Sequence, residues 1–239
     1  MPPTGAAEVS DTRRDYRVLV AEHALKLLEN IVRRRAIPIV VDWRRAERLV
    51  DDASSALKKA KYSFMPPSML ASSEEVEKLR STAEELARML VSKEKLAGVK
   101  LDARTRLALA EARYALRVLY GLPYRLRLGD DNNPLYAVDI ECVEVLSVSK
   151  MPRAENLYVT RARGLIGYTI VTNILDVKRG ELRAAAILPP REFYGEISEA
   201  MYCSKPLSLD KCSPGKRPRL DIIDGGAVEG AVYSIVGKQ

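Results

Sequence analysis

The chain has 239 residues, of which 47% are hydrophobic and 30% are charged, and its formal net charge is +7. That length suits one large domain or two ordinary ones with a packed core. No apolar run reaches the roughly 18 to 20 residues of a membrane span, and residues 1–10 lack the pattern of a secretory signal. We therefore expect a cytoplasmic protein that crosses no membrane.

The first half of the chain repeats apolar residues with the period of an α-helix. A first helix is expected over 13–35, and Asp42 can cap a second one. Ser72 and Glu75 have the spacing of a capping box for a third helix, and Asp102 can cap a fourth. Four amphipathic helices joined by short loops predict a helical bundle.

A turn-rich stretch at 129–134, which reads Gly-Asp-Asp-Asn-Asn-Pro, predicts a domain boundary. It divides the chain into a helical domain at 1–129 and a second domain at 135–239. The second domain has short alternating or β-branched runs, which predict strands at 136–148, 156–163, 168–172, 182–188, 200–203 and 231–236. Five or six short strands suit a closed barrel such as an OB-fold. The expected fold class is α+β with two domains, a helical bundle followed by an OB-fold β-barrel.

Three cysteines and one histidine are the only residues of their types, and none of the cysteines forms a Cys-x-x-Cys pair. Cys142, Cys203, Cys212 and His23 are too scattered to favour a structural zinc site. We therefore expect no metal or other cofactor. A Cys203–Cys212 disulfide is an alternative to free thiols. His23 lies among apolar residues and is interpreted as structural rather than as a general base.

The positive charge is unevenly distributed. Residues 1–129 hold 25 basic and 17 acidic side chains, whereas 130–239 hold 14 and 15. A basic protein favours phosphate or an anionic surface. Basic clusters at 33–35, 44–45 and 58–61 ordinarily form a solvated helix face, and the alternative is a second RNA-contacting surface.

Three stretches of the second half occur in the order of the motifs of a known family. Residues 145–159 read Val-Leu-Ser-Val-Ser-Lys-Met-Pro-Arg-Ala-Glu-Asn-Leu-Tyr-Val, 170–173 read Ile-Val-Thr-Asn, and 186–201 end in Ile-Ser-Glu-Ala-Met. Together they resemble the tRNA-binding domain of the endothelial-monocyte-activating-polypeptide type, which is also appended to aminoacyl-tRNA synthetases. The whole chain resembles archaeal predicted RNA-binding proteins that carry such a C-terminal domain.

The chain departs from the family pattern at three positions. Met151 replaces the usual His, Glu155 the usual Asp, and Ala200 the Gly of the Ser-Glu-Gly-Met motif. The first change removes a side chain that could contact RNA or brace the loop. The other two changes are conservative.

The resemblance implies binding of tRNA or another structured RNA along one face of an OB barrel, by phosphate contacts and base stacking. The candidate phosphate contacts are Lys150, Arg153, Arg161, Arg163, Lys178, Arg179, Arg183 and Arg191. The further candidates are Asn156, Asn173, Ser198, Glu199 and Met201.

Among these candidates, Arg161 and Arg163 are preferred because alternate residues of a strand share a face. For Ser198, Glu199 and Met201 a structural role, pinning a strand or filling the core, is the equal alternative. Tyr158 is interpreted as core rather than as a stacking platform.

The sequence has no phosphate-binding loop and no nucleophile elbow, so a non-catalytic RNA-binding protein is the expected function. The alternative is a protein-interaction scaffold or chaperone-like module associated with an aminoacyl-tRNA synthetase. The apolar seam that includes Leu79 and Leu86 is interpreted as intramolecular core, with a homodimer interface as the alternative.

The composition predicts heat resistance. Gln239 is the only glutamine, whereas Lys, Arg and Glu are abundant, which is the hyperthermophile pattern. We expect calorimetry to give a melting midpoint above that of ordinary mesophilic domains. A midpoint in the mesophilic range of about 45 to 65 °C would contradict the prediction.

Overall fold

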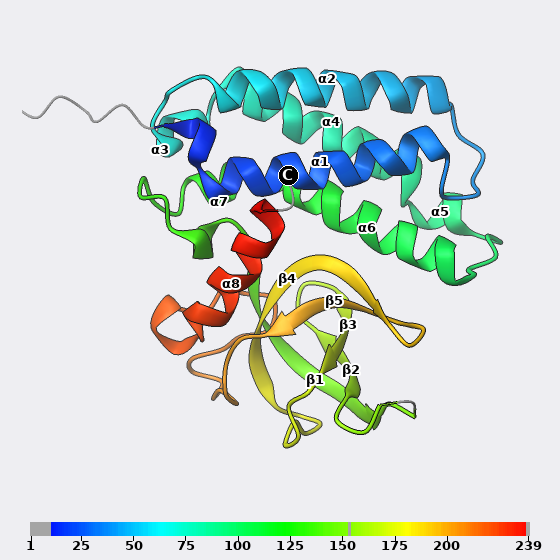
Figure 1. Ribbon diagram of the computed structural model, residues 1–239, viewed down its shortest axis with the longest axis vertical. Helices are drawn as coiled ribbons and strands as arrows, with labels where there is room; N and C mark the ends of the chain where they lie inside the picture. The colour runs from blue at the N-terminus through cyan, green and yellow to red at the C-terminus, as the bar shows by residue number, and fades with distance from the viewer. Residues whose placement is uncertain (1–10, 153, 238–239) are drawn as a thin grey trace, which may run out of the picture.

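The computed structural model describes residues 11–152 and 154–237. Figure 1 shows a layer of helices lying over a strongly curved sheet. The long helices are α1 (Tyr16–Arg34), α2 (Trp43–Lys61), α4 (Glu74–Leu90) and α6 (Ala103–Tyr120). The shorter ones are α3 (Pro67–Leu70), α5 (Lys93–Leu96), α7 (Leu122–Leu126), α8 (Gly225–Val236) and the 3-10 turns η1 (Thr12–Arg14), η2 (Pro134–Tyr136) and η3 (Leu220–Ile222).

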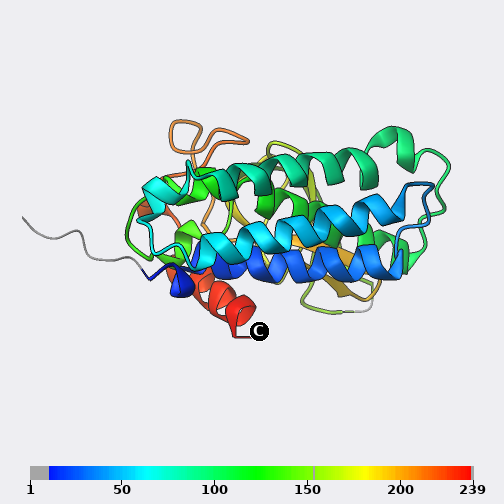
Figure 2. The same ribbon diagram turned by 90° about the horizontal axis from the view of Figure 1, so that it is seen from above.

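The long helices pack as the predicted bundle. Seen from above, α1, α2 and α4 lie side by side (Figure 2), and α6 packs between them and the sheet. Leu79 and Leu86 are fully buried, which confirms that the apolar seam is intramolecular core. No helix in the described ranges is long and apolar enough to cross a membrane.

Side-chain caps set where these helices begin. Asp42 accepts a hydrogen bond from the Arg45 N–H at 3.0 Å, and Asp102 accepts one from the Thr105 N–H at 2.8 Å, as predicted. The expected capping box at Ser72 is wrong by one residue, because Ser73 accepts the Val76 N–H.

The second half forms one antiparallel sheet. Its strands are β1 (Ile140–Lys150), β2 (Tyr158–Arg163), β3 (Gly167–Thr172), β4 (Leu182–Phe193) and β5 (Glu196–Tyr202), in the order β3-β2-β1-β4-β5. The α+β fold class with a helical and a sheet part is therefore confirmed.

The described strands do not close into the expected barrel through backbone hydrogen bonds, because β3 and β5 remain as the two edges of the sheet. Among the described residues no ladder joins β3 to β5, but side chains bridge the two edges. The Thr169 N–H donates to the Glu199 carboxylate and the Val171 N–H donates to the Ser198 hydroxyl, each at 3.0 Å. Two side chains of β5 thus satisfy donors of the β3 edge that a ladder would otherwise pair.

The strand predicted at 231–236 is wrong, because this segment belongs to helix α8. Asp224 caps α8 by accepting from the Ala227 N–H at 3.2 Å. Val228, Val232 and Ile235 are buried at helical spacing where α8 packs on α1, η2 and β4. Tertiary packing has overridden the β propensity of these branched side chains.

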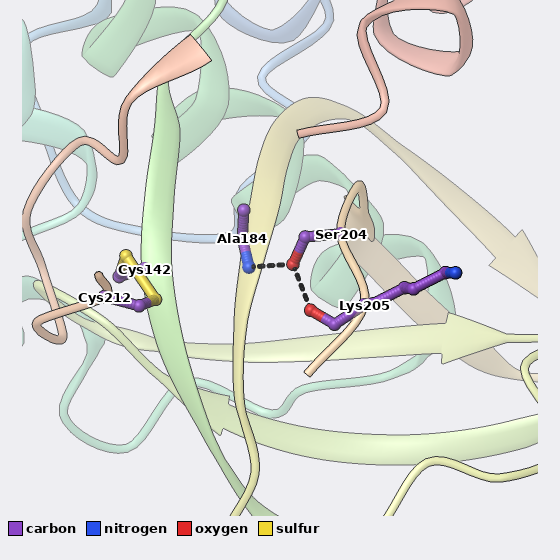
Figure 3. The surroundings of a disulfide bond; sticks show 5 residues. All are labelled: Cys142, Ala184, Ser204, Lys205 and Cys212. Carbon is purple, nitrogen blue, oxygen red and sulfur yellow. Dashed lines mark hydrogen bonds between the residues drawn. A yellow bond between two sulfur atoms is a disulfide. The ribbon is translucent and has the colours of Figure 1, made fainter. Parts of the chain in front are cut away.

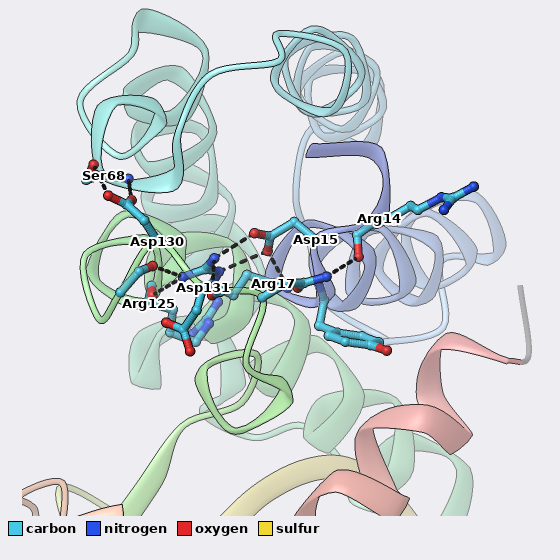
Figure 4. A network of polar contacts seen from close by, with 10 residues as sticks. Arg14, Asp15, Arg17, Ser68, Arg125, Asp130 and Asp131 are labelled. Carbon is cyan, nitrogen blue, oxygen red and sulfur yellow. Dashed lines mark hydrogen bonds and ion pairs between the residues drawn. The ribbon is translucent and has the colours of Figure 1, made fainter. Parts of the chain in front are cut away.

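The predicted domain boundary is fastened to the helical bundle rather than free (Figure 4). Arg17 is 1% exposed, forms an ion pair with Asp15 at 2.6 Å, and donates to the Gly129 and Asp131 carbonyls at 2.6 and 3.2 Å. Asn132 accepts from the Tyr16 N–H at 2.9 Å. The Arg17 guanidinium therefore satisfies backbone carbonyls of this turn that would otherwise need hydrogen bonds from water.

Replacing Arg17 with Met should lower the free energy of unfolding by about 3 to 5 kcal/mol, because the buried Asp15 carboxylate loses its counter-ion. Chemical denaturation measures the loss. Arg14→Met is the matched control, since the Arg14 side chain is 86% exposed and should cost little. Equal stability of the two variants would contradict the role given to Arg17.

Candidate nucleic-acid interface

A cluster of buried and half-buried charges joins the helical half to the sheet. Arg117 of α6 lies 2.7 Å from Asp139, which also lies 2.9 Å from Arg125 of α7. Arg117 additionally contacts Glu141 and the Tyr168 hydroxyl, and that hydroxyl donates to Glu141 at 2.8 Å. Burial acts to raise the pKa of Asp139, but the guanidinium groups of Arg125 and Arg117 hold it below its ordinary value.

Glu141 also positions the turn between β2 and β3. Its second carboxylate oxygen accepts the Leu165 N–H at 3.0 Å. The residue before Leu165 is Gly164, where a side chain would collide with the Glu141 carboxylate. As a result Leu165 and Ile166 are held outward, 70% and 51% exposed.

A disulfide joins Cys142 of β1 to Cys212, so the Cys203–Cys212 pairing considered from the sequence is wrong (Figure 3). Cys203 is a buried thiol whose pKa burial raises to about 12. The Gly215 N–H donates to the Cys142 carbonyl, and the Cys142 N–H donates to the Lys216 carbonyl, both at 2.8 Å. The segment at 212–217 is thereby fastened along β1.

We use "basic groove" for a cavity of about 460 Å³ between α5, α6 and the sheet. Its lining includes Arg106 and Arg113 of α6 and Arg161 of β2. Arg106 donates to the Gly195 carbonyl at 3.4 Å, and Arg161 lies 3.6 Å from Glu196. The Arg113 side chain is exposed and makes no hydrogen bond or ion pair with any described residue. Cations from both halves therefore face one space.

We use "apolar groove" for a neighbouring cavity of about 660 Å³. Its lining includes Tyr120 and Tyr124 on the helical side and Leu165 and Ile166 on the sheet side. Val91 and Arg113 line both grooves, so the two are continuous along the junction of the halves.

The structure places most of the predicted RNA contacts on the surface, but not together. Arg161 lines the basic groove, and Arg163 is exposed on the same strand, 3.0 Å from Glu144. The exposed candidates elsewhere on the sheet and its loops are Lys150, Asn156, Asn173, Lys178, Arg179 and Arg191. Arg153 lies outside the described residues.

Four other candidates are buried or half-buried in the structure. Arg183 is 2% exposed and paired with Glu181 at 2.8 Å, so its selection as a phosphate contact is wrong. Ser198 is buried and, with Glu199, bridges β5 to β3, which is the structural alternative for both. Met201 is half-buried beside α8.

Sequence reasoning missed the contribution of α6 to this junction. Arg106, Arg113 and Tyr120 are spaced by seven residues each, which places them on one face of a helix. The three basic clusters that drew attention instead lie on or beside α1 and α2, and α2 is the helix farthest from the sheet (Figure 1). This seven-residue spacing is the sequence signal that could have identified the face of α6 at the junction.

Comparison with protein families gives a match to a model described as an alpha helical domain, over residues 9–129. No curated protein matches the chain.

Asp139→Asn should destabilise the fold by about 3 kcal/mol near neutral pH, because Arg117 and Arg125 lose a buried counter-ion. Folding lowers the pKa of Asp139, so its contribution is present above the pKa of unfolded Asp and is lost as the pH falls through the folded value. The stability gap between wild type and variant should therefore narrow on acidification. Denaturant titrations across that pH range measure the gap.

Asp51 of α2 supplies the control, since its exposed side chain forms no ion pair or hydrogen bond with a described residue. Asp51→Asn should change stability little at every pH. A gap for Asp139→Asn that stays constant on acidification would show that its carboxylate is not the titrating group.

Proposed function

The chain belongs to the alpha helical domain family, and we propose that it is a non-catalytic protein that binds structured RNA, with tRNA as the preferred class. In this proposal the sheet is an OB-type barrel whose β2–β3 face meets the RNA across the basic groove. Three observations support it.

The first support is topological. OB-folds are partly open five-stranded barrels that bind nucleic acid on the face of strands 2 and 3 and on two adjoining loops. Here β3 and β5 meet through Ser198 and Glu199, as a partly open barrel would allow. Arg161 lies on β2, and Gly195 of the β4–β5 turn lies at the rim of the basic groove.

The observation that carries the proposal is the convergence of Arg106, Arg113 and Arg161 on the basic groove from two parts of the chain. Glu196 offsets part of the charge of Arg161, whereas Arg113 has no partner among the described residues. Guanidinium groups recognise phosphate by charge-assisted, bidentate hydrogen bonds. Structured RNA is recognised mainly through its backbone and shape, which suits such a surface.

The third support is the resemblance of 145–159, 170–173 and 186–201 to tRNA-binding domains, which favours tRNA over other structured RNA. It also connects the protein with aminoacyl-tRNA synthetases as partners. The competing function is a protein-interaction scaffold, which would need no phosphate contact.

Titration of the full chain with bulk tRNA and with a size-matched DNA duplex, at low and moderate salt, tests the proposal. We expect preferential binding of tRNA that weakens as salt rises. Arg113→Ala and Arg161→Ala should each weaken binding roughly tenfold and flatten the salt dependence.

Arg104→Ala is the matched control, because Arg104 is also exposed on α6 but lies nine residues from Arg113, on the opposite face. It should bind as the wild type does. Equal losses in all three variants would mean that general charge, not the basic groove, drives binding. An absence of salt-dependent binding would discard the RNA proposal in favour of the scaffold.

A further inference from the structure

The apolar groove has one wall that the fold holds open to solvent. Leu165 and Ile166 project from the β2–β3 turn, and the Glu141 carboxylate fixes the Leu165 backbone. Gly215, at φ +84°, packs against the same turn, where a side chain would lie 3.1 Å from the Leu165 side chain. Fixed and exposed apolar side chains in a concavity are characteristic of binding surfaces.

The opposite wall carries two tyrosines. Tyr120 is 44% exposed and Tyr124 is 53% exposed. The Arg80 guanidinium lies 5.1 Å from the centre of the Tyr120 ring and donates to its hydroxyl at 3.3 Å, which holds that ring in place. A positioned aromatic ring is a stacking platform for a base.

Two cations border the same groove without a salt bridge to any described carboxylate. One is Arg113, at the junction with the basic groove. The other is Arg217, whose guanidinium donates to the Val138 and Leu135 carbonyls at 3.1 and 2.6 Å. The three carboxylates that line this groove are paired with other cations: Asp139 and Glu141 bind Arg117, Asp139 also binds Arg125, and Glu84 binds Arg88.

From these features we propose that the apolar groove holds one unpaired nucleotide. Its base lies between the tyrosines and the Leu165–Ile166 wall, and its phosphate lies toward Arg113. A volume of about 660 Å³ suits a ligand of that size. Only an unpaired base can expose both of its faces to such walls.

This inference rests on the proposed function. The two grooves are continuous, so an RNA backbone can pass from one to the other alongside Arg113. In addition, an unpaired end or loop of a structured RNA is recognised separately from its backbone. The same chemistry would accept a free mononucleotide, so the experiment must distinguish the two sources.

The test compares two RNA hairpins with the same stem, one blunt and one with a 3′ single-stranded overhang that contains the fluorescent adenine analogue 2-aminopurine. Free AMP is the third probe, and the full chain is used throughout. We expect the overhang hairpin to bind roughly tenfold more tightly than the blunt one, with quenching of 2-aminopurine emission on stacking.

Variants locate the effect. Tyr124→Leu and Ile166→Ser should remove the preference for the overhang and the quenching while leaving blunt-hairpin binding unchanged. Arg113→Ala should weaken both hairpins. Tyr62→Leu is the control, because Tyr62 is 52% exposed but does not line either groove. Circular dichroism confirms that each variant is folded.

The outcomes separate the two proposals. Equal binding of both hairpins without quenching overturns the nucleotide site and leaves RNA binding standing. AMP binding that competes with the overhang and is lost in Tyr124→Leu supports the site and assigns it to a free nucleotide. An absence of binding by both hairpins and by AMP overturns both proposals.

Discussion

The relation of the two halves depends on the pairing of Asp139 and Glu141 at the start of β1 with Arg117 and Arg125 of the helical layer. Both arginines lie on or near the sheet-facing side of the bundle, and Arg125 is fully buried. Removing either side of such a cluster leaves buried charge uncompensated, which costs several kcal/mol. The start of β1 is therefore held against Arg117 of α6 and Arg125 of α7, and the remaining strands follow it by register.

Other contacts extend this constraint along the junction. Arg17 fastens the turn that connects the halves, and the Cys142–Cys212 disulfide fastens the C-terminal segment to β1. Glu141 both completes the charge cluster and orients Leu165. Arg117, Asp139 and Glu141, which stabilise the junction, thus also line the apolar groove. A rigid concavity with exposed cations and aromatic rings costs less to organise for binding than a flexible one.

The proposed site draws on positive charge from both halves of the chain. The helical half holds the excess of basic residues, yet the motifs that resemble a tRNA-binding domain lie in the other half. Placing the site at the junction brings the two together, since Arg106 and Arg113 come from α6 and Arg161 comes from β2. In the proposed RNA-binding function, the helical half contributes to binding directly instead of serving only as a support for the sheet.

The sequence by itself determined the elements that depend on neighbouring residues. These include the period of the long helices, the caps at Asp42 and Asp102, and the strands β1 to β4, because periodicity and capping are local physics. The tertiary structure alone decided whether 225–236 is a helix, which cysteine pairs with Cys212, and that Arg183 is buried. Each of these outcomes depends on residues distant in the chain, and Cys142 and Cys212 are 70 residues apart. The grooves likewise exist only because two separately predictable halves meet at one buried set of charges.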